Sequence, residues 1–378
     1  MFLKSLRLNH YRNYEKVEFT TNHNVNILIG PNAQGKTNLL EAIFVIALSK
    51  SYRTSKDKEL IGWNLREASI SAEIEKKYGT VGLDLLITQH GKKTKINGLE
   101  QKKLSEFIGT LNIVMFSPED LEMIKGSPGV RRRFLDMEIG QVQPSYLHHL
   151  MQYQKVLAQR NNMLKMNNPM NEAGKMMLDV WNEQLASHGV KIMKKRQQFI
   201  NKLQIRAENI HTGITNGREK LRIVYQPSFE SKDIEDEPIL FNHFMIKLSQ
   251  IREQEFKRRM TLAGPHRDDL QFYINDKEVI SFGSQGQQRT AALSLKLAEI
   301  ELIKEEVGEY PVLLLDDVLS ELDRYRQTQL ILTFQDKVQT FITTTGIESI
   351  DWSQLRHAGV FHVHNGTVTK ANESINEG

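Results

Sequence analysis

The residues best suited to chemistry lie near the start of the chain, in Gly30-Pro31-Asn32-Ala33-Gln34-Gly35-Lys36-Thr37. Two glycines separated by four residues, then a lysine and a hydroxyl residue, have the spacing of a phosphate-binding loop, or P-loop. The glycines allow successive backbone N–H groups to point at phosphate oxygens, and a helix that begins near Lys36 adds its positive end. Lys36 would contact the β and γ phosphates of a nucleotide, and the Thr37 hydroxyl would bind Mg²⁺.

The segments on either side have the form that such a loop requires. Residues 27–29 are an apolar run typical of a buried strand, and Leu39, Leu40, Ile43 and Phe44 recur at helical spacing after the loop. The alternative is a glycine-rich turn that precedes a lysine by chance, which would need neither flank. We therefore expect the chain to bind a nucleotide.

A second candidate group follows the apolar segment 312–315. Four aliphatic residues in a row predict a central parallel strand, and Asp316 and Asp317 stand where that strand would reach the edge of the sheet. In P-loop ATPases a carboxylate at a strand end holds the Mg²⁺ ion, because that point faces the phosphates. Asp316 fits this place. A solvated strand end is the alternative, although it would not require the buried run before it.

A third stretch, Gly283-Ser284-Gln285-Gly286-Gln287-Gln288-Arg289, opens a segment with apolar residues at helical spacing. By itself it is compatible with an ordinary serine-capped helix. Placed after the P-loop and before Asp316, it resembles the signature motif of ATP-binding-cassette (ABC) ATPases. Ser320-Glu321-Leu322-Asp323 similarly resembles the D-loop of that class.

Taken together, these motifs make the chain similar to the RecF family of bacterial DNA repair proteins, which is related to the SMC group of cassette ATPases. The matching stretches extend along the whole chain, at residues 11–14, 30–37, 51–54, 117–121, 126–136, 264–270, 283–290 and 313–323. The resemblance implies ATP-dependent dimerisation on DNA and a preference for gap junctions between double- and single-stranded DNA. It also implies cooperation with RecO and RecR in loading RecA, and roles in replication-fork repair and the SOS response.

By the same resemblance, each ATP lies between two copies of the chain. One copy provides residues 30–37, and the other provides Ser284 and Gly286. Gln287 and Asp323 are assigned to the nucleotide as well. A hydroxyl at the positive end of a helix is a sensible partner for the γ phosphate.

Two departures from the cassette pattern predict slow hydrolysis. The position of the usual water-activating glutamate is taken by Asp317, which is one methylene shorter, and a strand that often ends in histidine ends in Thr343-Thr344-Thr345. A misplacement of about 1 Å can cost about two orders of magnitude in rate. We therefore expect a weak DNA-dependent ATPase with Asp317, Lys36 and Asp316 as catalytic residues, in which ATP acts as a clamp switch.

Composition narrows the class of protein. The 378 residues are 39% hydrophobic and 25% charged, as in ordinary soluble proteins, and no apolar stretch is long enough for a membrane span. There is no cysteine for a disulfide or a thiolate metal site, and the first residues do not form an export signal, so we expect a cytoplasmic, nucleoid-associated protein. The net charge of +4 does not by itself identify a nucleic-acid binder.

Basic clusters at residues 131–133, 191–196 (with Lys194, Lys195 and Arg196) and 257–259 are candidate DNA contacts. Solvated helix faces are the alternative for each cluster, and internal ion pairs are a further alternative for residues 131–133.

The expected fold is α/β: an ABC-type P-loop ATPase head, with a mixed β-sheet and helices, and an inserted helical second lobe. The head, with a β subdomain, would span residues 1–116 plus 262–378, and the lobe residues 117–261. Alternating apolar residues predict strands within 1–24, 69–99, 111–116, 221–229, 271–274, 278–282 and 340–344. Helical spacing predicts a hairpin of two antiparallel helices with its turn at 167–171, and a helix over 241–260.

Three other functions remain as alternatives. In the nucleotide-binding subunit of an ABC transporter, the segment between Lys36 and Ser284 would be too long for a compact cassette domain. An SMC-like structural ATPase would need far longer heptad arms than the helical hairpin provides. A small-molecule kinase would leave the motif at Ser284 without a purpose.

Overall fold

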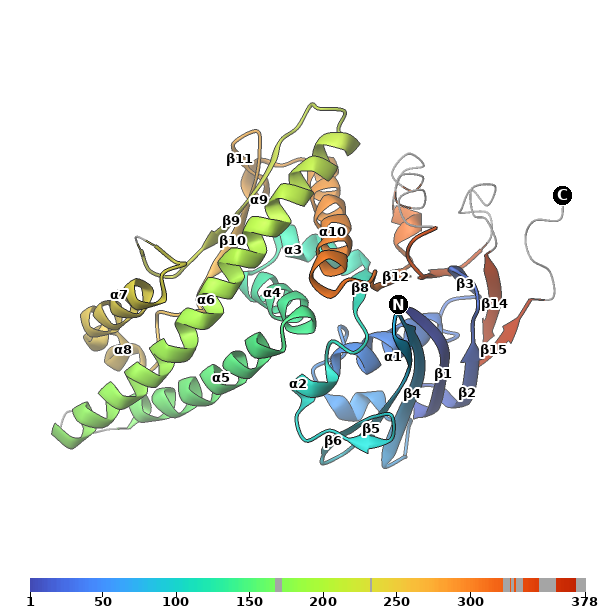
Figure 1. The fold of residues 1–378 in the computed structure, drawn as a ribbon, viewed down its shortest axis with the longest axis horizontal. Helices are drawn as coiled ribbons and strands as arrows, with labels where there is room; N and C mark the ends of the chain where they lie inside the picture. The colour runs from blue at the N-terminus through green and yellow to red at the C-terminus, as the bar shows by residue number, and fades with distance from the viewer. Residues whose placement is uncertain are drawn as a thin grey trace. The chain divides into compact units, whose positions relative to one another are not determined.

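The computed structural model describes residues 1–166, 172–231, 233–321, 327, 330, 336–346 and 358–371. The chain divides into two compact units (Figure 1). Unit 1 consists of Met1–Asp120 and Leu293–Gly378, and unit 2 consists of Leu121–Ala292.

The first sheet of unit 1 is antiparallel, with strand order β2-β1-β4-β5-β6-β7. Its strands are β1 (Phe2–Tyr11), β2 (Tyr14–Thr20), β4 (Glu67–Lys76), β5 (Gly79–Thr88), β6 (Gly91–Ile96) and β7 (Leu99–Glu100). In β4 every second side chain is buried, as expected for a strand with one face in the core and one toward solvent. The strands predicted within residues 1–24 and 69–99 are therefore present in this sheet.

The second sheet has the order β15-β14-β3-β13-β12-β8. Its strands are β3 (Val25–Ile29), β8 (Ile113–Phe116), β12 (Val312–Asp316), β13 (Thr340–Thr344), β14 (Gly359–His364) and β15 (Thr367–Lys370). All neighbouring pairs are parallel except β14 with β15. The carboxyl ends of β3, β12 and β13 therefore meet at one edge, where Asp316 pairs with Thr343, and Thr344 with Ile29.

Helix α1 (Lys36–Leu48) packs against strands of both sheets of unit 1. Eleven of its 13 residues are buried. Because almost all sides of the helix face the core, its sequence is apolar on nearly every side. Short helices complete the described part of this unit: η1 (Asp57–Leu60), α2 (Leu104–Phe107), η2 (Pro118–Asp120) and η3 (Val318–Glu321).

Unit 2 is mainly helical. It contains α3 (Leu121–Lys125), α4 (Pro128–Val142), α5 (Pro144–Lys165), α6 (Glu172–Ile214), α7 (Glu237–Gln250), α8 (Arg252–Arg258) and α9 (Val279–Phe282). Strands β9 (Leu221–Gln226), β10 (Asp269–Ile274) and β11 (Lys277–Glu278) form an antiparallel sheet in the order β11-β10-β9. Helix α10 (Gln285–Val307) begins in this unit and ends in unit 1. Figure 1 shows α5 and α6 side by side, and bonds such as Arg160 to Asn182 give their antiparallel pairing. The predicted turn between them, 167–171, lies outside the described residues.

Two predicted elements differ from the structure. The strand expected over 278–282 is wrong beyond Glu278, because Val279–Phe282 forms the short helix α9, closed by a bond from the Gly283 N–H to the Val279 carbonyl. Over a stretch this short, periodicity does not separate strand from helix. The helix expected over 241–260 is two helices, α7 and α8, that meet at Ile251.

The limits of unit 2 also differ from those expected for the inserted lobe. The sequence predicts that residues 262–292 belong to the head, whereas in the structure they belong to unit 2, which extends to Ala292. The cause is strand pairing: β10 pairs along its whole length with β9, which ties residues 269–274 to the helical part of the chain. The division of the chain into independently folding domains stays a prediction.

Candidate nucleotide-binding site

The P-loop follows β3 and has a backbone that only small residues tolerate. Gly35 has φ 118° and Ala33 has φ 64°, both in the left-handed region. A Cβ atom at Gly30 would collide with the Val363 carbonyl of β14. The glycine spacing seen in the sequence is therefore a steric requirement of this loop.

The loop is braced from two sides by other parts of unit 1. The Tyr14 hydroxyl donates to the Gly35 carbonyl at 2.9 Å. In the turn between β14 and β15, the Asn365 N–H donates to Oε1 of Gln34 at 2.8 Å and the Gly366 N–H to the Gln34 carbonyl at 3.2 Å. These bonds fix the backbone of the loop against β2 and against the turn between β14 and β15.

Lys36 lies in this loop, 8% exposed, with its ammonium bonded to the carbonyls of Gly30 and Pro31 at 2.5 and 2.8 Å. Burial lowers the pKa of Lys36, while the nearby charges of Asp317 and Asp316 act in the opposite direction. The first turn of α1 carries no acidic residue, so the positive helix end is not neutralised from within that turn. This combination is suited to binding the phosphates of a nucleotide.

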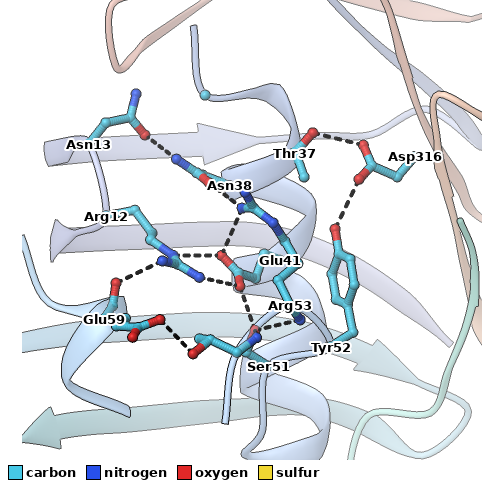
Figure 2. Close-up of polar contacts among 12 residues, drawn as sticks. Arg12, Asn13, Thr37, Asn38, Glu41, Ser51, Tyr52, Arg53, Glu59 and Asp316 are labelled. Atoms are coloured by element: carbon cyan, nitrogen blue, oxygen red, sulfur yellow. Dashed lines mark hydrogen bonds and ion pairs between the residues drawn. The ribbon is translucent and has the colours of Figure 1, made fainter. Parts of the chain in front are cut away.

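Asp316 is the centre of a second group of contacts, at the end of β12. Its Oδ1 accepts a bond from the Thr37 hydroxyl at 3.0 Å, and its Oδ2 accepts one from the Tyr52 hydroxyl at 3.0 Å (Figure 2). The Thr343 hydroxyl donates a further bond to Oδ1 at 2.9 Å. Thr37 donates its only hydroxyl proton to Asp316. The lone pairs of the Thr37 hydroxyl oxygen remain available for another partner. A hydroxyl beside a carboxylate is a set of oxygen ligands that fits Mg²⁺.

Asp317 follows directly and has a different environment. Its side chain is exposed, its φ is 54°, and its N–H donates to the Thr343 hydroxyl at 2.9 Å. One threonine on β13 thus contacts both consecutive acidic residues. The two strand ends meet because β12 and β13 are parallel neighbours, and the sequence predicted neither this pairing nor the contacts of Thr343.

Behind the P-loop, a buried ion cluster fixes the start of α1. Glu41 is fully buried and accepts two bonds from Arg12, at 2.8 and 2.7 Å (Figure 2). The Ser51 hydroxyl donates to it at 2.5 Å, and Arg53 forms an ion pair with it at 3.4 Å. Burial acts to lower the pKa of Arg12, but the hydrogen bonds and charge of Glu41 outweigh it, and the pKa is raised.

The predicted second half-site is a capped helix start in unit 2. The Ser284 hydroxyl accepts a bond from the Gln287 N–H at 3.2 Å, and Oε1 of Gln287 accepts one from the Ser284 N–H at 2.9 Å. Ser284 and Gly286 are exposed, whereas Gln287 also bonds Glu219 at 2.9 Å. Ser284 belongs to unit 2 and the P-loop to unit 1, so the assignment of Ser284 to the nucleotide stays a prediction. Asp323 lies outside the described residues.

Two of the basic clusters include arginines committed to internal contacts. Arg131 pairs with Asp269 at 2.6 Å, and Arg132 donates to the Asp268 carbonyl at 2.7 Å. Arg196 is buried and pairs with Asp136 at 2.8 Å. For Arg131 the alternative of an internal ion pair is therefore confirmed. The side chains of residues 257–259 are exposed, and their contact with DNA stays a prediction.

Comparison with known proteins decides the family. The model of the RecF/RecN/SMC N terminal domain matches residues 2–369. Proteins named DNA replication and repair protein RecF, from Bacillus cereus and Bacillus anthracis, are 54% identical over 368 residues, which cover 97% of this chain and 98% of theirs. The chain belongs to the RecF family. Its function therefore lies in DNA replication and repair, as the motifs predicted.

Solved structures support the same family and confirm the predicted fold class. The recombination mediator protein RecF with ATP, from the RecFOR pathway, matches with a TM-score of 0.90 and 35% identity, over 98% of this chain and 97% of that one. The Smc head domain of Pyrococcus furiosus matches with a TM-score of 0.56 at 16% identity, which shows a shared ATPase-head fold. Within the described residues, no helix is both long and apolar enough to span a membrane.

The sequence-based reasoning did not assign a role to Tyr52, Thr343 or Glu41. One signal was available: Glu41 is a lone charge in the apolar helix segment 39–48. A charge in such a place requires a buried partner. Arg12 and Arg53 belong to two of the family-like stretches, 11–14 and 51–54, to which the motifs gave no role.

Proposed function

We propose that the chain binds ATP through residues 30–37 and Mg²⁺ through Thr37 and Asp316, and that ATP switches it into a DNA-bound dimer. The proposal depends on one observation: three features lie together at the start of α1. They are the buried Lys36, a first helical turn without acidic residues, and the hydrogen bond between Thr37 and Asp316. A RecF of 35% identity that is described with ATP supports the choice of nucleotide.

Each residue has a distinct task in this proposal. The loop amides and Lys36 hold the phosphates, exchanging the bonds of the ammonium to Gly30 and Pro31 for bonds to phosphate oxygens. Mg²⁺ bound near Asp316 would neutralise part of the phosphate charge. Asp317, exposed beyond the strand end, orients and deprotonates the attacking water.

Hydrolysis is slow in this proposal. Asp317 is shorter than glutamate, and the strand that often ends in histidine ends in Thr343-Thr344-Thr345, which offers no imidazole. We expect a turnover number well below the enzyme median of about 10 s⁻¹. A slow step suits a clamp that stays closed on DNA between rounds of hydrolysis.

The second copy completes the site. Its Ser284 and Gly286, exposed at the start of α10, contact the γ phosphate, with Gln287 and Asp323 nearby. The dimer binds gap junctions between double- and single-stranded DNA and works with RecO and RecR to load RecA. The RecFOR pathway named for the related RecF structures supports these partners.

The test is DNA binding by the native chain with ATP and Mg²⁺, compared with ADP, on gapped and on fully paired DNA. We expect ATP to tighten binding to gapped DNA most. Lys36→Met removes the ammonium at similar length and is expected to abolish both ATP binding and its effect on DNA. Equal DNA affinity with ATP and ADP, or a Lys36→Met variant that still responds to ATP, would refute the switch.

A further inference from the structure

Tyr52 makes a contact with the expected metal site that neither the motifs nor the family comparison assigns. It lies in the loop after α1, half-buried, and its hydroxyl donates to Oδ2 of Asp316 at 3.0 Å (Figure 2). The hydroxyls of Thr37 and Thr343 both bond the other oxygen, Oδ1. Among the described residues, Tyr52 is thus the one whose side chain bonds Oδ2, and this bond keeps the carboxylate from rotating.

The tyrosine is itself held in place on two sides. Its ring meets Phe44 of α1 edge-on, with the ring centroids 5.1 Å apart. The hydroxyl of Ser51, the preceding residue, accepts the N–H groups of Arg53 at 2.9 Å and Thr54 at 3.1 Å, which fixes the backbone turn. The same hydroxyl donates to the buried Glu41 at 2.5 Å.

We propose that Tyr52 is a positioning residue for the Mg²⁺ carboxylate, an inference that rests on the proposed function. The tyrosine fixes the plane of the Asp316 carboxylate. The carboxylate therefore does not have to rotate when Mg²⁺ binds. Hydrogen bonds behind metal-binding groups typically change metal affinity or activity by about 10- to 100-fold. The tyrosine acts through Asp316 and does not touch the phosphates.

A purely structural role for Tyr52 makes a different prediction. If the residue only packs the loop against Phe44, replacing it with phenylalanine keeps the ring and changes little. If it packs the whole P-loop, nucleotide affinity falls equally with and without the metal. A role in positioning Asp316 lowers only the part of nucleotide affinity that Mg²⁺ provides.

The experiment measures binding of a fluorescent ATP analogue to native chain and to Tyr52→Phe, in EDTA and across a titration of Mg²⁺. We expect unchanged affinity in EDTA, and an increase of about tenfold or more in the Mg²⁺ concentration that gives half-maximal binding. Electron paramagnetic resonance can follow the binding of Mn²⁺ in place of Mg²⁺ to the complex of chain and nucleotide. We expect Tyr52→Phe to bind Mn²⁺ more weakly than the native chain does, by a similar factor.

Tyr14→Phe is the matched control, because it removes another buried hydroxyl that bonds the P-loop at Gly35 and not the carboxylate. We expect its effect to be equal in EDTA and in Mg²⁺. An unchanged Mg²⁺ midpoint in Tyr52→Phe, or a loss of equal size in EDTA, would overturn the inference alone. A native chain that binds no nucleotide with Mg²⁺ would overturn the proposed function and this inference together.

Discussion

Replacing Arg12 with lysine tests how much the buried cluster behind the P-loop contributes to stability. Arg12 donates two bonds to Glu41, at 2.8 and 2.7 Å, and a third to the Glu59 carbonyl at 2.8 Å. Lysine keeps the charge but presents one point donor in place of the planar fork, so about two of these bonds are lost. Glu41 has no exposed surface through which water could replace them.

The magnitude follows from those contacts. A bond to a charged group contributes about 1.5–3 kcal/mol, and breaking a buried pair outright costs about 3–5 kcal/mol. Because lysine retains the charge, we expect a loss of about 3 kcal/mol in the free energy of unfolding of unit 1. Arg7→Lys is the control: it makes the same change on β1, the strand that precedes the turn carrying Arg12. Arg7 pairs with Glu18, and their side chains are 59% and 61% exposed, so this change should cost no more than about 1 kcal/mol.

Native-state hydrogen exchange is the suitable assay, since a chain of two units has no single unfolding free energy. Amides of α1 and β1 that exchange by unfolding of unit 1 should exchange about 100-fold faster in Arg12→Lys, because about 1.4 kcal/mol corresponds to tenfold. Exchange no faster than in Arg7→Lys would refute the claim that the cluster stabilises the P-loop helix.

Two further predictions concern hydrolysis and pH. Asp317→Asn keeps the shape of the side chain but removes the base, so turnover should fall by about 100-fold or more while ATP binding persists; unchanged turnover would exclude Asp317 as the base. Burial lowers the pKa of His266 to about 4, below its ordinary value near 6.5, so the unfolded chain binds the proton more readily between these values. Stability of unit 2 should therefore be complete above about pH 6.5 and decline as the pH falls toward about 4. In His266→Gln the decline, measured by native-state hydrogen exchange of amides in unit 2, should be smaller, and an equal decline would assign the effect to other groups.

Much of the fold could be predicted from the sequence, and so could the part of the candidate site formed by the P-loop and Asp316. Both depend on patterns within short stretches of the chain. The P-loop has a fixed spacing within residues 30–37, and the apolar run before Asp316 requires a buried strand that ends at the sheet edge. All five residues of β12 are buried, and the strand is paired at both edges, with β8 and β13. Side chains on both faces of such a central strand lie in the core, which explains why the apolar run is unbroken.

The remaining contacts join residues that are distant in the sequence. Tyr52 and Asp316 are 264 positions apart, and Arg131 and Asp269 are 138 apart, so no local pattern relates them. A basic cluster that binds phosphates and one that pairs inside the protein have the same composition, and only the fold distinguishes them. The proposed half-site at Ser284 requires a second copy, and one chain does not contain that arrangement.

Joint binding of ATP by two copies is the central claim, and sedimentation velocity tests it most directly. Asp317→Asn, with ATP and Mg²⁺, should sediment as two chains and, without nucleotide, as one. The same chain with Ser284→Arg added should still bind the fluorescent nucleotide yet sediment as one chain, because the long cation blocks the second half of the site. If the chain without Ser284→Arg remained a single copy in saturating ATP and Mg²⁺, with and without gapped DNA, the claim would be contradicted.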